Sequence, residues 1–93
     1  MELVKISARS VPRLSAGAIA AVIREGKTVE VQAIGAGAAN QAIKSVAIAR
    51  DYVKNEGMDL VCQPAFKTVE IGDSEKTAIQ IVVKSVKIQE DAE

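Results

Sequence analysis

Apolar and polar residues alternate or recur along this chain in a pattern that predicts six secondary-structure elements. Two short alternating segments, Glu2 to Ser7 and Val29 to Ile34, predict strands, because successive side chains of a strand point to opposite faces. After each of them, apolar residues recur at helical spacing and predict helices over Leu14 to Glu25 and Gly37 to Asn55. A glycine follows each helix and favours its end there.

The pattern beyond the second helix predicts two more strands. Leu60 to Gln63 and Val69 to Ile71 form one interrupted strand in this prediction, because Pro64 has no N–H for a sheet ladder and implies a bulge or an edge. A turn follows at Gly72 to Glu75. Thr77 to Lys84 then alternates again and predicts the last strand.

The order β-α-β-α-β-β predicts an α/β two-layer sandwich, in which a mixed four-stranded sheet carries two helices on one face. The other face is then expected to be polar, and the alternating positions that support this are Lys5, Ser7, Glu30, Gln32, Gln80 and Lys84. We expect a single domain over residues 1–88. Residues 89–93 are expected to form a frayed acidic C-terminal tail.

The second predicted helix has a core stripe and a polar side. At 100° per residue, the core stripe consists of Ala42, Val46, Ala49 and Val53, and the polar side of Asn40, Lys44, Asp51 and Asn55. Ile48 falls on the polar side and Ile43 on the flank. They are either ordinary exposed residues or part of the interface of a homodimer.

Composition excludes several function classes. Tyr52 and Phe66 are the only aromatic residues among 93, so the core is aliphatic and binding of single strands by base stacking is disfavoured. Cys62 is the single cysteine and the chain has no histidine, which removes the usual partners for catalysis or metal binding. We therefore predict no enzyme activity, no catalytic residue, no metal, no cofactor and no small-molecule substrate.

Charge and hydropathy predict a cytoplasmic protein whose N-terminal part is basic. The net charge is zero, but residues 1–27 contain five basic and two acidic residues, a net charge of +3. The chain has no apolar run of membrane-spanning length and no signal-like start, which predicts no membrane contact. A weak binder of nucleic acid is compatible with this balance.

The glycine turn before the second helix allows two interpretations. The stretch Gly35 to Asn40, GAGAAN, lacks the third glycine of a dinucleotide-binding loop and the Lys and Ser/Thr of an NTPase loop. Either it is a tight corner, or its backbone N–H groups hold a phosphate at the helix start. In the second case the nucleic-acid-binding residues are Arg9, Ser10, Arg13, Gly35, Gly37, Asn40 and Lys44.

Three stretches, VKISARSV, VQAIGAGAANQAIKSVAIAR and DLVCQPAF, closely resemble the bacterial stage V sporulation protein S family over nearly the whole chain. The resemblance implies a small cytoplasmic regulator of sporulation or development with no catalytic role. It also implies an Alba-like fold, since that family is similar in element order to the dimeric Alba chromatin proteins.

Alba proteins bind nucleic acid with three groups of basic residues, which this chain matches unevenly. Arg9 and Arg13 match the group after the first strand. At the glycine turn, where Alba proteins carry arginine and lysine, this chain has Gly35, Ala36, Gly37 and Gln41. On the arm between the last two strands, the chain offers Lys67 and Lys76, together with Asp73 and Glu75.

Two functions therefore remain open. The first is a dimeric regulator that binds DNA or RNA through phosphate contacts, without base-specific readout. The second is a protein-interaction module that regulates development without contacting nucleic acid.

Overall fold

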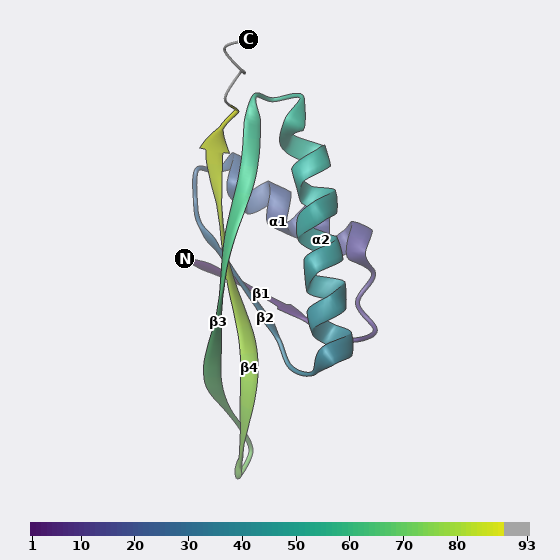
Figure 1. Cartoon of the computed structure of the whole chain (residues 1–93), viewed down its shortest axis with the longest axis vertical. Helices are drawn as coiled ribbons and strands as arrows, with labels where there is room; N and C mark the ends of the chain where they lie inside the picture. Colours follow the sequence, from purple (N-terminus) through teal and green to yellow (C-terminus); the bar gives the residue numbers. More distant parts are fainter. Residues whose placement is uncertain (89–93) are drawn as a thin grey trace.

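The computed structural model describes residues 1–88, and its elements follow the predicted order (Figure 1). They are β1 (Glu2–Ile6), α1 (Pro12–Arg24), β2 (Val29–Ala33), α2 (Ala36–Lys54), β3 (Met58–Ile71) and β4 (Ser74–Lys87). The acidic tail predicted for residues 89–93 lies outside the described residues.

The strands form one mixed sheet of four, in the order β1-β2-β4-β3. β1 and β2 are parallel, whereas β4 runs antiparallel to β2 and to β3. Each helix therefore links two parallel strands: α1 links the neighbours β1 and β2, and α2 links β2 to β3 across β4. Both helices lie on the same side of the sheet (Figure 1), which confirms the predicted two-layer α/β architecture.

The core between the layers is aliphatic, as the composition predicts. The sheet contributes every second residue, so that Val31 lies between Val4 and Ile81 in register and is fully buried. From the helices, Ile19 and Ile23 fill the centre. Small side chains let the two helices approach each other closely, and the buried alanines are Ala16, Ala20, Ala38, Ala42 and Ala49.

The structure corrects the predicted boundaries of α1 and β3. α1 begins at Pro12, two residues before the predicted Leu14, because proline is well suited to the first helical position. β3 is continuous through Pro64, which pairs with Ile81, so the predicted interruption is wrong. β3 is the last strand of the sheet, and an edge strand tolerates a missing N–H. Of the two alternatives that Pro64 predicts, a bulge or an edge, the structure shows the edge.

The long strands β3 and β4 form a hairpin arm that extends beyond the N-terminal end of α2 (Figure 1). Ile71 pairs with Ser74, so the turn consists of only Gly72 and Asp73 and is shorter than predicted. Gly72 has a φ of 61°, as the first central residue of a type II′ hairpin turn requires. The arm makes the molecule elongated, with a longest extent of 53 Å.

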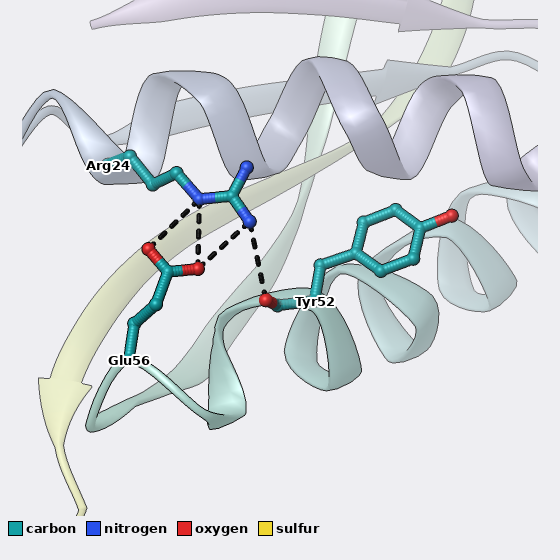
Figure 2. A network of polar contacts seen from close by, with 3 residues as sticks. All are labelled: Arg24, Tyr52 and Glu56. Carbon is teal, nitrogen blue, oxygen red and sulfur yellow. Dashed lines mark hydrogen bonds and ion pairs between the residues drawn. The ribbon is translucent and has the colours of Figure 1, made fainter.

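An ion pair between α1 and the turn after α2 fixes the two helix ends to each other (Figure 2). Arg24 donates from Nε to both carboxylate oxygens of Glu56, at 3.0 and 3.1 Å, and from Nη2 to the backbone oxygen of Tyr52 at 3.3 Å. The hydrogen bond to Glu56 raises the pKa of Arg24 above its ordinary value. These groups are exposed, so the pair sets the geometry of the helix ends more than it adds stability.

The sheet face turned away from the helices, hereafter the outer face, is polar only in part. Lys5, Gln32 and Gln80 lie on it side by side in register, as predicted. Leu3 and Ile71 also lie on the outer face and are 48% and 54% exposed. Alternation correctly assigns side chains to this face, but the prediction that the face is polar throughout is wrong.

A further ion pair crosses the outer face and ties the arm to the centre of the sheet. Lys67 Nζ of β3 donates to Glu30 Oε2 of β2 at 2.6 Å, although β4 lies between these strands. The Glu30 side chain is only 12% exposed. The hydrogen bond from Lys67 lowers the pKa of Glu30 below its ordinary value.

Replacing Glu30 with glutamine is expected to lower the free energy of unfolding by about 1 kcal/mol at pH 7, after allowance for solvent screening around Lys67. Because the folded-state pKa of Glu30 is lowered, this stabilisation is present above the ordinary glutamate pKa. It is lost as pH falls through the folded-state pKa. Urea denaturation of both proteins between pH 7 and pH 3 measures this difference. Glu75→Gln, at an exposed arm residue, is the control and should change little; an equal effect there would contradict the assignment.

Candidate nucleic-acid interface

The loop between β1 and α1 is held in shape by its own serines. The Ser7 backbone N–H donates to Ser10 Oγ at 2.9 Å, and the Arg9 N–H donates to Ser7 Oγ at 3.2 Å. The Ser10 N–H donates in turn to the Ser7 carbonyl at 3.1 Å. These bonds define a tight turn that presents the Arg9 side chain to solvent. Ser10 therefore has a structural part in the loop in addition to the predicted contact with phosphate.

This loop packs against the start of α2. A Cβ added to Gly37 would lie 3.1 Å from the Cβ of Ala8, closer than ordinary van der Waals contact. One turn along α2, Gln41 Nε2 donates to the Ala8 carbonyl at 3.3 Å. Gln41, which occupies a position where the Alba comparison leads one to expect a basic residue, thus positions the loop. This supports the tight-corner interpretation at Gly37.

Gly35 sets the direction in which the chain enters α2. Its φ of 91° and ψ of 161° lie in a region that is populated essentially by glycine alone. No side chain caps the helix and no acidic residue lies in its first turn. The first backbone bond within the helix runs from the Ala39 N–H to the Gly35 carbonyl, at 3.0 Å, which leaves the preceding N–H groups without helical acceptors. The same backbone therefore forms a corner and an anion-attracting helix start.

Three basic residues of the predicted site carry no acidic partner within residues 1–88. Arg9, Arg13 and Lys44 are exposed and form no ion pair there. In contrast, Arg24 and Arg50 are each neutralised by a carboxylate. The predicted site residues Arg9, Ser10, Gly35 and Gly37 are thus brought to one corner by the contact of Ala8 with α2. Asn40 and Lys44 follow on the exposed side of α2, one turn apart.

The hairpin arm offers little positive charge. Lys67 is occupied by Glu30, whereas Glu70, Asp73 and Glu75 surround a hollow of about 280 Å³ at the tip. Lys76 alone remains as an exposed basic residue near this end. The match to the basic arm of Alba proteins is therefore poorer in three dimensions than in the sequence.

The two predicted dimer residues differ in their surroundings. Ile43 is 55% exposed, as expected for a contact residue. Ile48 is half-buried and packs against the core, so its predicted place on the polar side of α2 is wrong. The projection assumed that α2 buries a single stripe against the sheet. α2 also contacts α1, so a larger part of its circumference is buried than a single stripe, and this part includes Ile48.

Phe66 is an exposed apolar residue that sequence reasoning did not assign to a surface. It shares one face of β3 with Leu60, Cys62 and Pro64, since these positions alternate along the strand. Leu60 is buried in the core, whereas Phe66 is 81% exposed. The helices therefore leave this part of β3 uncovered. Because the predicted strand stops at Pro64, the prediction does not place Phe66 on the same face as Leu60.

Other chemistries find no support in the described part of the chain. Cys62 is exposed, and residues 1–88 contain no group of three or more side chains placed to hold a metal ion. Neither helix has the length and apolar character needed to cross a membrane.

Fold and site together define a small α/β protein in which a basic loop packs against an uncapped helix start. A family model described as stage V sporulation protein S (SpoVS) matches residues 2–86. The match covers nearly the whole chain, so this chain belongs to the SpoVS family, as the three sequence stretches predict. SpoVS is a regulatory sporulation family and not a known enzyme family, which implies a sporulation-related role.

Proposed function

We propose that this protein is a non-enzymatic cytoplasmic regulator of sporulation or development that binds the phosphate backbone of nucleic acid as a homodimer. The observation that carries the proposal is the corner where the loop of Arg9 contacts the start of α2. At this corner Ala8, the residue before Arg9, contacts Gly37 and Gln41, and the first N–H groups of α2 have no helical acceptors. A phosphate binds both guanidinium groups and such N–H groups.

The corner favours phosphate contacts over base recognition. Arg9 and Arg13 suit phosphate oxygens, and the open N–H groups at Gly35 to Ala38 need no basic side chain to attract an anion. Contacts of this kind fix a protein on a duplex but carry no sequence information. Binding is therefore expected to be weak, with little sequence preference and a steep dependence on salt.

The experiment that tests this function is a titration of the protein with labelled duplex DNA, duplex RNA and their single strands at two salt concentrations. The proposal expects binding to duplexes at low salt, with an affinity that falls steeply as salt rises. If none of these four nucleic acids binds at low salt, the proposal is rejected.

The dimer part of the proposal is centred on Ile43. Ile43 lies two turns before Arg50 on the same side of α2, and Arg50 donates to Asp59 of β3 at 2.7 Å. That side of α2 therefore faces the β3 edge of the sheet, where Phe66 is uncovered. A second copy that covers Ile43 and Phe66 would remove two large apolar side chains from water. Ile48, packed against the core, would contribute only its exposed edge.

Replacing Ile43 with glutamate is expected to weaken self-association at least tenfold, because a dimer would bury an unpaired charge. Sedimentation velocity over a range of micromolar concentrations measures this. Leu14→Glu is the matched control, since Leu14 is 74% exposed on α1, and it should leave self-association unchanged. A wild-type protein that stays monomeric throughout would reject the dimer.

A protein-interaction module is the second candidate, and one observation favours it. The arm carries an acidic tip and the exposed Phe66, features that suit a protein partner better than a nucleic acid. If none of the four nucleic acids binds at low salt, this second function replaces the first.

A further inference from the structure

The outer face of the sheet contains a groove that reaches the loop between β1 and α1, where Ser7 and Ala8 line it. It lies between the C-terminal ends of β1 and β2 on one side and the arm on the other, and its volume is about 500 Å³. This size falls within the range of small-ligand sites. The apolar residues that line it are Leu3, Ile6, Ala8, Ile34, Val69 and Ile71.

The groove has a fixed far wall. Lys67 lines it from β3, and the ion pair with Glu30 at 2.6 Å anchors this part of the arm to β2. β2 itself contributes Gln32 to the floor of the groove. The hollow is therefore bounded by strands that are tied to each other and, at one end, by Ser7 and Ala8 of the loop between β1 and α1.

The charges in the groove are distributed unequally. Glu30 already neutralises Lys67, whereas Lys5 on the opposite wall has no acidic partner within residues 1–88. Lys5 lies beside Gln32 in the register of β1 and β2, and both side chains point to the outer face. Both residues line the groove, so it offers an ammonium group and an amide from neighbouring strands. Glu70 lines the arm side and disfavours an anion there.

We propose that this groove binds a small amphipathic anion, namely an aliphatic chain that carries one carboxylate. The carboxylate accepts hydrogen bonds from the Lys5 ammonium and the Gln32 amide. The chain lies along Ile34, Val69 and Ile71, which are partly or largely exposed without a ligand. The lining contains no aromatic side chain, so it favours an aliphatic chain over a stacked ring.

The test is an NMR titration of protein labelled at isoleucine, leucine and valine methyl groups, with hexanoate, octanoate and decanoate as probes below their micellar concentrations. The methyl signals of Ile34 and Ile71 are expected to shift and saturate, with affinity rising about threefold for each added CH₂. Decylammonium is expected to bind at least tenfold more weakly than decanoate. This readout is independent of nucleic acid, so its failure leaves the proposed function untouched.

Two variants and one control complete the test. Lys5→Gln is expected to weaken decanoate binding about tenfold, and Ile71→Ser to weaken it about fivefold. Lys84→Gln, on the same sheet face but outside the groove, should bind as the wild type does. Methyl spectra of the free variants report whether each is folded. Absence of saturable shifts at millimolar decanoate, shifts centred on Phe66 instead, or equal effects of Lys5→Gln and Lys84→Gln would overturn the proposal.

Discussion

Replacing Gly35 with alanine is expected to lower the free energy of unfolding by about 2 kcal/mol. Gly35 has a φ of 91° and a ψ of 161°, where the Cβ of any other residue meets the neighbouring backbone. Relief of this strain would require the chain to enter α2 in another direction, which moves the helix start away from the loop of Ala8. For a chain of this size, the melting temperature should fall by roughly 10 °C. Thermal and urea denaturation measure both values.

The matched control is Gly17→Ala in the middle of α1. A Cβ at Gly17 meets no atom within 4 Å, and Gly17 is helical. This variant is expected to be more stable than the wild type by about 0.5–1 kcal/mol, because alanine restricts the unfolded chain and favours a helix. Equal effects at Gly35 and Gly17 would show that the corner at Gly35 does not depend on its backbone conformation.

The double change Arg9→Ala and Arg13→Ala is expected to abolish most duplex binding at moderate salt. These guanidinium groups have no acidic partner within residues 1–88, so they are available to phosphate. Loss of two phosphate contacts per subunit should reduce the slope of log affinity against log salt by about two units per subunit. The fall should be similar for duplexes of different sequence, because the contacts are to the backbone.

The control for this double variant removes the same charge elsewhere. Lys54 and Lys87 lie at the end of α2 and the end of β4, away from the corner, and both are exposed. Lys54→Ala with Lys87→Ala should preserve most of the affinity and of the salt slope. If the two double variants lose affinity equally, net charge and not the corner determines binding. If the variant at Arg9 and Arg13 keeps the wild-type slope, the loop is not the contact surface.

The predicted fold depended on signals that are local in the chain. Period-two alternation in β1, β2 and β4 and helical spacing in α1 and α2 were sufficient for the element order and for most of the core. Pro64 predicts an interrupted strand with a bulge or an edge, and the structure shows a continuous edge strand. β3 is an edge strand and pairs only with β4. A proline whose nitrogen faces away from β4 removes no hydrogen bond of the sheet, so the pairing of β3 with β4 continues through Pro64.

The candidate site was predicted in part for a similar reason. Arg9, Arg13 and the glycine turn are visible as residue types, but the packing of the Arg9 loop on the turn depends on the contact of Ala8 with Gly37 and Gln41. These residues are about thirty positions apart in the chain, and no periodicity links them. The predicted position of Ile48 is wrong because a helical projection locates a single buried stripe. α2 packs against both α1 and the sheet, so its buried surface is wider than one stripe.

By itself the sequence determined the family, the order of the elements, the aliphatic core and the basic residues near the start. Each of these follows from residue type or from spacing within one element. The tertiary structure alone decided which basic groups remain unpaired, that Lys67 is tied to Glu30, and that a groove opens on the outer face. These properties depend on the twist and register of strands far apart in sequence. A local pattern assigns side chains to a face but does not determine which distant side chains meet there.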